Sequence, residues 1–104
     1  MAAEITHDLI VAAVNQGYSD ELMITARNAG ALGGTIMNVR GQTREEAVKC
    51  LGVSIRDEKE MIFILTSREK KVCIMRAISE AHGINSKAQG IIYSLPVDTI
   101  MGSE

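Results

Sequence analysis

Apolar positions along the chain alternate between short unbroken runs and longer stretches with helical spacing. The short runs predict four strands: Leu9–Val14, Thr35–Arg40, Met61–Leu65 and Gly90–Leu95. Two amphipathic stretches, residues 19–30 and 69–82, predict helices that stop at Gly30 and Gly83. This order predicts an α+β, ferredoxin-like βαββαβ fold in a single domain over residues 1–104, with two helices on one face of an antiparallel sheet.

Two of the predicted strands are apolar on both faces. Leu9–Val14 and Met61–Leu65 lack the alternation of apolar and polar residues that a strand with one solvated face would show. Two helices cover only one face of a sheet, and burying a large apolar side chain gains about 1.5–3 kcal/mol. We therefore expect the other face to be buried in a homo-oligomer, with sheet packed against sheet.

Residues with turn and cap preferences mark the ends of these elements. Ser19 and Asp20 are predicted to cap the first helix, and Ser67 the second. Gly33-Gly34 predicts a tight turn, because glycine adopts a positive φ and lets another group approach the backbone closely. Pro96 is expected to end the fourth strand.

A long insert, residues 41–60, separates the second and third strands. Thr43 and Glu46 form a capping-box pattern that predicts a short helix, and the charged stretch Arg56–Glu60 is expected to be solvated. Long insertions in compact domains are usually functional or disordered. The insert is therefore interpreted either as a loop that binds an effector or a protein partner, or as a surface loop without function.

Composition and charge narrow the function classes. The 104 residues carry a net charge of −2 and 3% aromatic residues, which disfavours nucleic-acid binding. No apolar run approaches the roughly 20 residues that span a bilayer, and the first residues lack a secretory signal. The two cysteines, Cys50 and Cys73, have no metal or redox spacing. We expect a cytoplasmic protein without direct membrane insertion.

The sequence shows no pattern typical of a catalytic or metal site. A Ser/His/Asp or Cys/His set is not evident, so no catalytic residue is assigned and an enzyme is not expected. No metal ligand is assigned, because His7 and His82 lie in separate elements without a partner at helical spacing.

Several short stretches resemble the P-II nitrogen-regulatory superfamily, over roughly residues 8–102. Ala26–Ala31, Gly34-Thr35 and Arg40-Gly41 are similar to that family's helix end, second strand and entry to its long T-loop. Ala77-Ile78 and Pro96-Val97 are similar to parts of its second half. The resemblance implies a homotrimeric signalling protein that regulates nitrogen utilisation. It would hold ATP or ADP in clefts between subunits and control an enzyme or transporter through the loop at about 41–60.

The resemblance also implies an effector site with members from both halves of the chain. Thr35 matches a position near the adenine, Gly41 and Arg44 match the T-loop base, and Lys59 matches a lysine used toward 2-oxoglutarate. An arginine or lysine at such a site can pair with phosphate. The implied effector-binding residues are Gly34, Thr35, Gly41, Arg44, Lys59, Lys87 and Gly90.

Departures from the family pattern leave the ligand open. Glu45 stands where the family has a glutamine that helps to seat magnesium and 2-oxoglutarate, and Ile91 stands where its phosphate turn has a lysine. The arginines that follow the family's last strand are absent, and no tyrosine lies between Gly41 and Glu60 for uridylylation. Two hypotheses therefore remain: an adenine nucleotide, or a different small effector in the same cleft.

Two other functions occur on the same fold. A CutA-type trimeric protein that binds divalent metals would need histidine or cysteine facing a cleft, and this sequence offers few. An acylphosphatase-like hydrolase would need an arginine in the loop after the first strand, where Asn15–Tyr18 has none.

Overall fold

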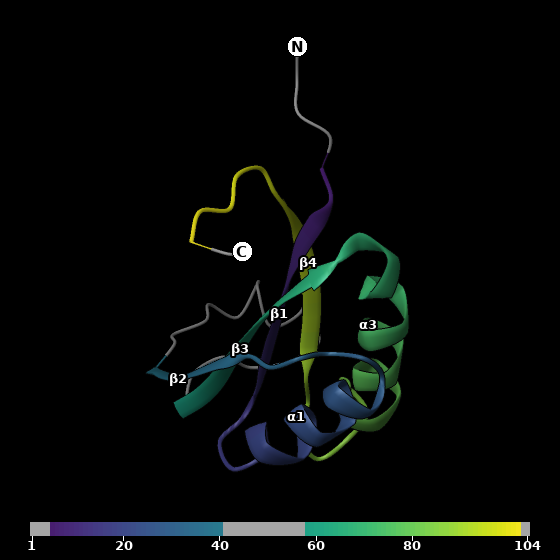
Figure 1. Cartoon of the computed structure of the whole chain (residues 1–104). Helices are drawn as coiled ribbons and strands as arrows, with labels where there is room; N and C mark the ends of the chain where they lie inside the picture. The colour runs from purple at the N-terminus through teal and green to yellow at the C-terminus, as the bar shows by residue number, and fades with distance from the viewer. Residues whose placement is uncertain (1–4, 41–57, 103–104) are drawn as a thin grey trace, which may run out of the picture.

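The computed structural model describes residues 5–40 and 58–102 of the chain. The elements follow the order β1 (His7–Asn15), α1 (Ser19–Asn28), β2 (Thr35–Arg40), β3 (Glu58–Ser67), α3 (Arg68–His82) and β4 (Ile91–Val97). Neighbouring strands are antiparallel, in the order β2-β3-β1-β4. Both helices lie on one face of this sheet (Figure 1), which confirms the predicted ferredoxin-like fold.

The hydrophobic core lies between the two helices and the sheet face that they cover. Its fully buried members are Ile10, Ala12, Val14, Leu22, Ala26, Ile62, Ile64, Ile74 and Ile78. They recur every second residue on the strands and every fourth on the helices, so one face of each element points into the core. Neither described helix combines the length and apolar character needed to cross a bilayer.

The opposite sheet face, which we call the open face, is also apolar, and no described helix covers it (Figure 1). Strand register aligns its side chains in three rows: Leu65–Leu9–Leu95, Phe63–Val11–Tyr93 and Met61–Ala13–Ile91. Met37 of β2 continues the third row. Among its large side chains, Met37, Leu65, Tyr93 and Leu95 are 43–50% exposed. The prediction of two apolar sheet faces is thus confirmed.

Two strands extend beyond their predicted ends. β3 already begins at Glu58, and Lys59 is only 6% exposed, so the prediction that this charged stretch is solvated is wrong there. β4 continues through Pro96 to Val97. Proline has no backbone N–H. It is tolerated because β4 is an edge strand, where an N–H that points away from β1 would have no hydrogen-bond partner in the sheet.

The first helix takes its cap from the sheet and not from the predicted Ser19. Tyr18 occupies the N-cap position and makes no side-chain cap hydrogen bond. Instead, the Glu60 carboxylate of β3 accepts hydrogen bonds from the backbone N–H groups of Gly17 (2.7 Å) and Ser19 (3.3 Å), and from Ser19 Oγ (3.0 Å). A negative charge at this position also suits the helix dipole.

The start of α3 is attached to β1 by an ion pair. Ser67 occupies the N-cap position as predicted, but its hydroxyl makes no cap hydrogen bond, and the Arg68 N–H donates to Thr6 O at 3.0 Å. The Arg68 guanidinium donates to both carboxylate oxygens of Asp8, at 3.0 and 3.2 Å. Lys71 Nζ lies 3.6 Å from the same carboxylate, which is 1% exposed. These contacts position the first turn of α3 against the sheet.

Gly33-Gly34 does not form the predicted turn with positive φ. The left-handed conformation is found instead at Gly30, with φ +120°, where α1 ends. Gly34 is required for a different reason, because a Cβ there would lie 3.0 Å from Phe63 O and 3.1 Å from Ile64 Cγ1. The predicted close approach is therefore confirmed, and it lets β2 begin directly against β3.

Candidate functional site

Asn15, the last residue of β1, joins the beginning of β3 to the turn before β4. Its side-chain oxygen accepts a hydrogen bond from the Lys59 ammonium. Its side-chain amide donates to Lys87 O at 2.9 Å and to Gln89 Oε1 at 3.3 Å, and its backbone N–H donates to Ala88 O at 2.9 Å. Two predicted site residues, Lys59 and Lys87, are thus connected through Asn15. Sequence reasoning missed Asn15, whose signal is a polar residue that ends an apolar run.

Lys59 is a buried lysine at the beginning of β3. Its side chain is almost fully enclosed, and its described hydrogen-bond partner, Asn15 Oδ1, is neutral. Burying a charge is costly unless an opposite charge or several hydrogen bonds compensate for it. The Lys87 contact uses only its backbone carbonyl, and Lys87 itself is exposed. Asn15 thus links the buried Lys59 ammonium to the backbone of the 86–90 turn.

The turn over residues 86–90 follows the end of α3 closely. The Gly90 N–H donates to His82 O at 2.9 Å, and a Cβ on Gly90 would lie 2.3 Å from that oxygen. Gln89 has a φ of +48°, in the left-handed region that non-glycine residues rarely adopt. Close packing on α3 therefore explains the glycine at position 90, whatever the turn binds.

The other predicted site residues lie at the far edge of the sheet or outside the described residues. Thr35 begins β2 opposite Phe63, while Gly90 precedes β4. Because β3 and β1 lie between β2 and β4, three strand spacings, or about 14 Å, separate the two edges. Gly34 and Thr35 thus do not meet Lys87 and Gly90 within one chain. Gly41, Arg44 and the Thr43–Glu46 capping box fall outside the described residues.

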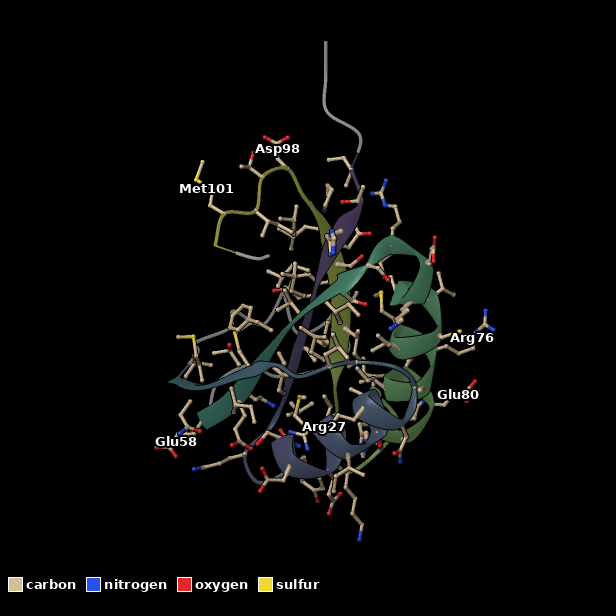
Figure 2. All side chains as sticks on the ribbon, viewed as in Figure 1. Arg27, Glu58, Arg76, Glu80, Asp98 and Met101 are labelled. Carbon is tan, nitrogen blue, oxygen red and sulfur yellow. The ribbon has the colours of Figure 1, made fainter. Side chains whose placement is uncertain are left out.

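Two hollows that no local sequence pattern indicates lie among the described residues. One, of about 240 Å³, is lined by His7, Gly30, Leu32, Leu65, Thr66, Ser67 and Lys70. The other, of about 460 Å³, runs between α3 and the outer edge of β4 and is lined by Val72, Met75, Arg76, Ser79, Glu80, Ile84, Gly90 and Ile92. Arg76 and Glu80 project outward from α3 beside it (Figure 2). The first hollow forms between elements that are distant in the sequence, and the second between α3 and β4, which follow one another along the chain.

The two histidines occupy separate places. His7 Nδ1, at the start of β1, lies 2.9 Å from Thr6 Oγ1. His82, at the end of α3, is buried, and its Nε2 lies 2.8 Å from Thr25 Oγ1 of α1. In the part of the chain that the structure describes, no group of three or more His, Cys, Asp or Glu side chains is arranged to hold a metal ion.

Comparison with solved structures places this arrangement among known folds. A protein described as a PII-like signalling protein from Thermus thermophilus superposes with a TM-score of 0.67 at 18% identity, over 89% of this chain and 87% of that one. Arabidopsis thaliana PII bound to citrate superposes with a TM-score of 0.69 at 18% identity, over 91% of this chain and 78% of that one. The fold is that of the PII and PII-like signalling proteins. Neither a protein-family model nor a curated protein sequence matches the chain.

Proposed function

We propose that this chain is a PII-like regulatory protein that senses a small anionic effector in clefts between the subunits of a homotrimer. It would act as a signalling protein in nitrogen regulation and not as an enzyme. It would control a partner enzyme or transporter through residues 41–60. The observation that carries the proposal is a PII fold whose sheet presents an apolar face that neither described helix covers.

The open face supports assembly. Leu65, Tyr93 and Leu95 are each more than 40% exposed; Leu9 lies between Leu65 and Leu95 in the strand register, and Tyr93 precedes Leu95 on the same face of β4. A contiguous apolar patch of this kind usually marks a protein interface. β2 and β4 are also edge strands, whose outer N–H and C=O groups need a partner or protection. Three copies with their sheets turned toward a common axis would bury the open faces and bring β2 of one copy beside β4 of the next.

The same assembly would complete the effector site. Within one chain, the β2 edge that begins at Thr35 lies about 14 Å from the β4 edge across the sheet. If β2 and β4 of adjacent copies pair, the two strands would lie about 5 Å apart, one strand spacing. The proposed cleft takes Gly34 and Thr35 from one copy and Lys59, Lys87 and Gly90 from its neighbour. Gly41 and Arg44 are assigned to it from the resemblance alone.

The charge of the site supports an anion as the effector. The buried Lys59 ammonium donates to the neutral Asn15 Oδ1, and an anion would compensate its charge; Lys87, whose backbone carbonyl accepts from Asn15, has an exposed side chain. The Arabidopsis PII structure was bound to citrate, which is such an anion. ATP and ADP are the other candidates of this class, although Ile91 supplies no phosphate-binding lysine.

A mixed-trimer experiment tests the shared cleft. Thermal-shift titrations with ATP, ADP, AMP and citrate identify the anion, and Thr35→Trp and Lys87→Glu are each expected to abolish its binding. Because each cleft would draw these residues from different copies, trimers refolded from an equal mixture of the two variants should regain binding at about a quarter of their sites. Arg27→Glu, a charge reversal on the exposed side of α1, is the matched control and should bind normally.

Each result bears on a separate part of the proposal. Normal binding by Thr35→Trp or Lys87→Glu contradicts the assigned residues, and mixed trimers that regain no binding contradict a site shared between copies. A protein that no anion stabilises is not the proposed sensor. Stabilisation by a divalent metal alone would favour the CutA-type alternative.

A further inference from the structure

We propose that Asn15 is a positioning residue that couples the 86–90 turn to the beginning of β3. Asn15 pairs directly with Lys59 in the β1–β3 register, and the same side chain reaches the turn on its other side. The regulatory meaning of this coupling rests on the proposed function, because Lys59 and Lys87 are proposed effector residues. The coupling itself is a property of the folded chain and is testable without an effector.

The chemistry of its partners determines the orientation of the Asn15 amide. An ammonium group can only donate, so the Asn15 atom that faces Lys59 must be the carbonyl oxygen. A backbone carbonyl can only accept, so the atom that faces Lys87 O must be the amide nitrogen. Both ends require the same orientation. The side chain is therefore held between Lys59 and the turn as one connected hydrogen-bond network.

The turn depends on this attachment. Its internal backbone bonds include Gln89 N–H to Ser86 O at 3.1 Å, and Gln89 holds an unfavourable left-handed conformation. From β1, Asn15 donates hydrogen bonds to Lys87 O, Ala88 O and Gln89 Oε1. Loss of the Lys59 bond leaves Asn15 Oδ1 without its donor and lets the amide rotate away from the turn. An anion that attracts the Lys59 ammonium would have this effect, and by linkage the state of the turn would alter the affinity of Lys59 for the anion.

Hydrogen exchange in the full chain tests the coupling. Lys59→Met removes the ammonium and retains the apolar stem. It is expected to accelerate exchange of the Gln89 and Gly90 amides, read residue by residue by NMR, by about fivefold, the equilibrium factor of one net hydrogen bond. Lys71→Met is the matched control, because it removes a lysine beside Asp8 at the opposite end of the sheet. It should leave these two amides unchanged.

A second measurement uses the unmodified protein, so it tests the coupling even if the Lys59→Met variant does not fold. The side-chain amide protons of Asn15 should exchange more slowly with water than those of exposed Asn85. The coupling is overturned if the Gln89 and Gly90 amides of Lys59→Met exchange within about twofold of their rate in the unmodified protein. It is also overturned if the side-chain amide protons of Asn15 exchange as fast as those of Asn85. A protein that fails to trimerise or to bind an anion contradicts the proposed function and leaves this result intact.

Discussion

At the scale of single residues, Asp8 shows how a charge is held inside this small domain. The carboxylate is almost completely buried, and Arg68 and Lys71 lie beside it. The hydrogen bonds from Arg68 hold the pKa of Asp8 below its ordinary value, although burial acts in the opposite direction. An ionised, paired Asp8 thus stabilises the contact between β1 and the start of α3.

The pH dependence of stability follows from this pKa. Because the pKa of Asp8 is lower in the folded chain, its contribution is present above about pH 4, where the unfolded carboxyl is also ionised, and is lost as the pH falls through the folded pKa. Asp8→Asn should lower the free energy of unfolding at pH 7, measured by urea titration. In this variant the free energy of unfolding should also fall less steeply as the pH is lowered below about 4. Asp98→Asn, at an exposed aspartate, is the control. An unchanged acid profile for Asp8→Asn would contradict this account.

The sequence predicted some members of the candidate site and missed its centre. The family resemblance implies Lys59 and Lys87 as effector-binding residues. In the structure, Asn15 is hydrogen-bonded to the Lys59 ammonium and to the Lys87 backbone carbonyl. Asn15 itself lies 44 positions from Lys59 and 72 from Lys87 in the sequence. Such contacts depend on which strand residues face each other. That register is a property of the assembled sheet and not of any local pattern.

At the scale of elements, the turn before β4 depends on close packing with α3. A Cβ on Gly90 would overlap His82 O, whereas one on Gly33 would meet nothing within 4 Å. Gly90→Ala should therefore lower the free energy of unfolding by about 1–3 kcal/mol, the range for overpacked sites, and Gly33→Ala should be tolerated. Thermal unfolding of the two variants checks this. Equal melting temperatures would show that the turn moves freely away from α3.

The ends of elements were harder to predict than the elements themselves. Cap patterns assume that a nearby residue supplies the hydrogen bond, and on that basis the sequence predicts Ser19 as the cap. The acceptor at the start of α1 is instead Glu60, 41 residues away on β3. Pro96 was expected to end its strand, but an edge strand tolerates it. Both errors arise because tertiary neighbours supply what the local sequence lacks.

At the scale of the whole molecule, the apolar pattern predicted both the fold and its unusual open face. Unbroken apolar runs in two central strands predict cover on both sides, and the helices in residues 5–40 and 58–102 lie on only one. The two hollows were not predicted, because each forms where separate elements meet. What covers the open face is the central question, since the proposed effector cleft exists only if copies associate through it.

Sedimentation equilibrium of the full chain at micromolar concentration answers that question most directly. We expect a mass three times the 11.3 kDa of one chain. Leu95→Lys, on the open face, should shift the mass toward one chain, because a charge would have to be buried there. Ile24→Lys, at an apolar residue of α1 that is 58% exposed against 43% for Leu95, should leave the trimer intact. A single-chain mass for the unmodified protein would contradict the account, since neither the open face nor the effector cleft would then have its partner.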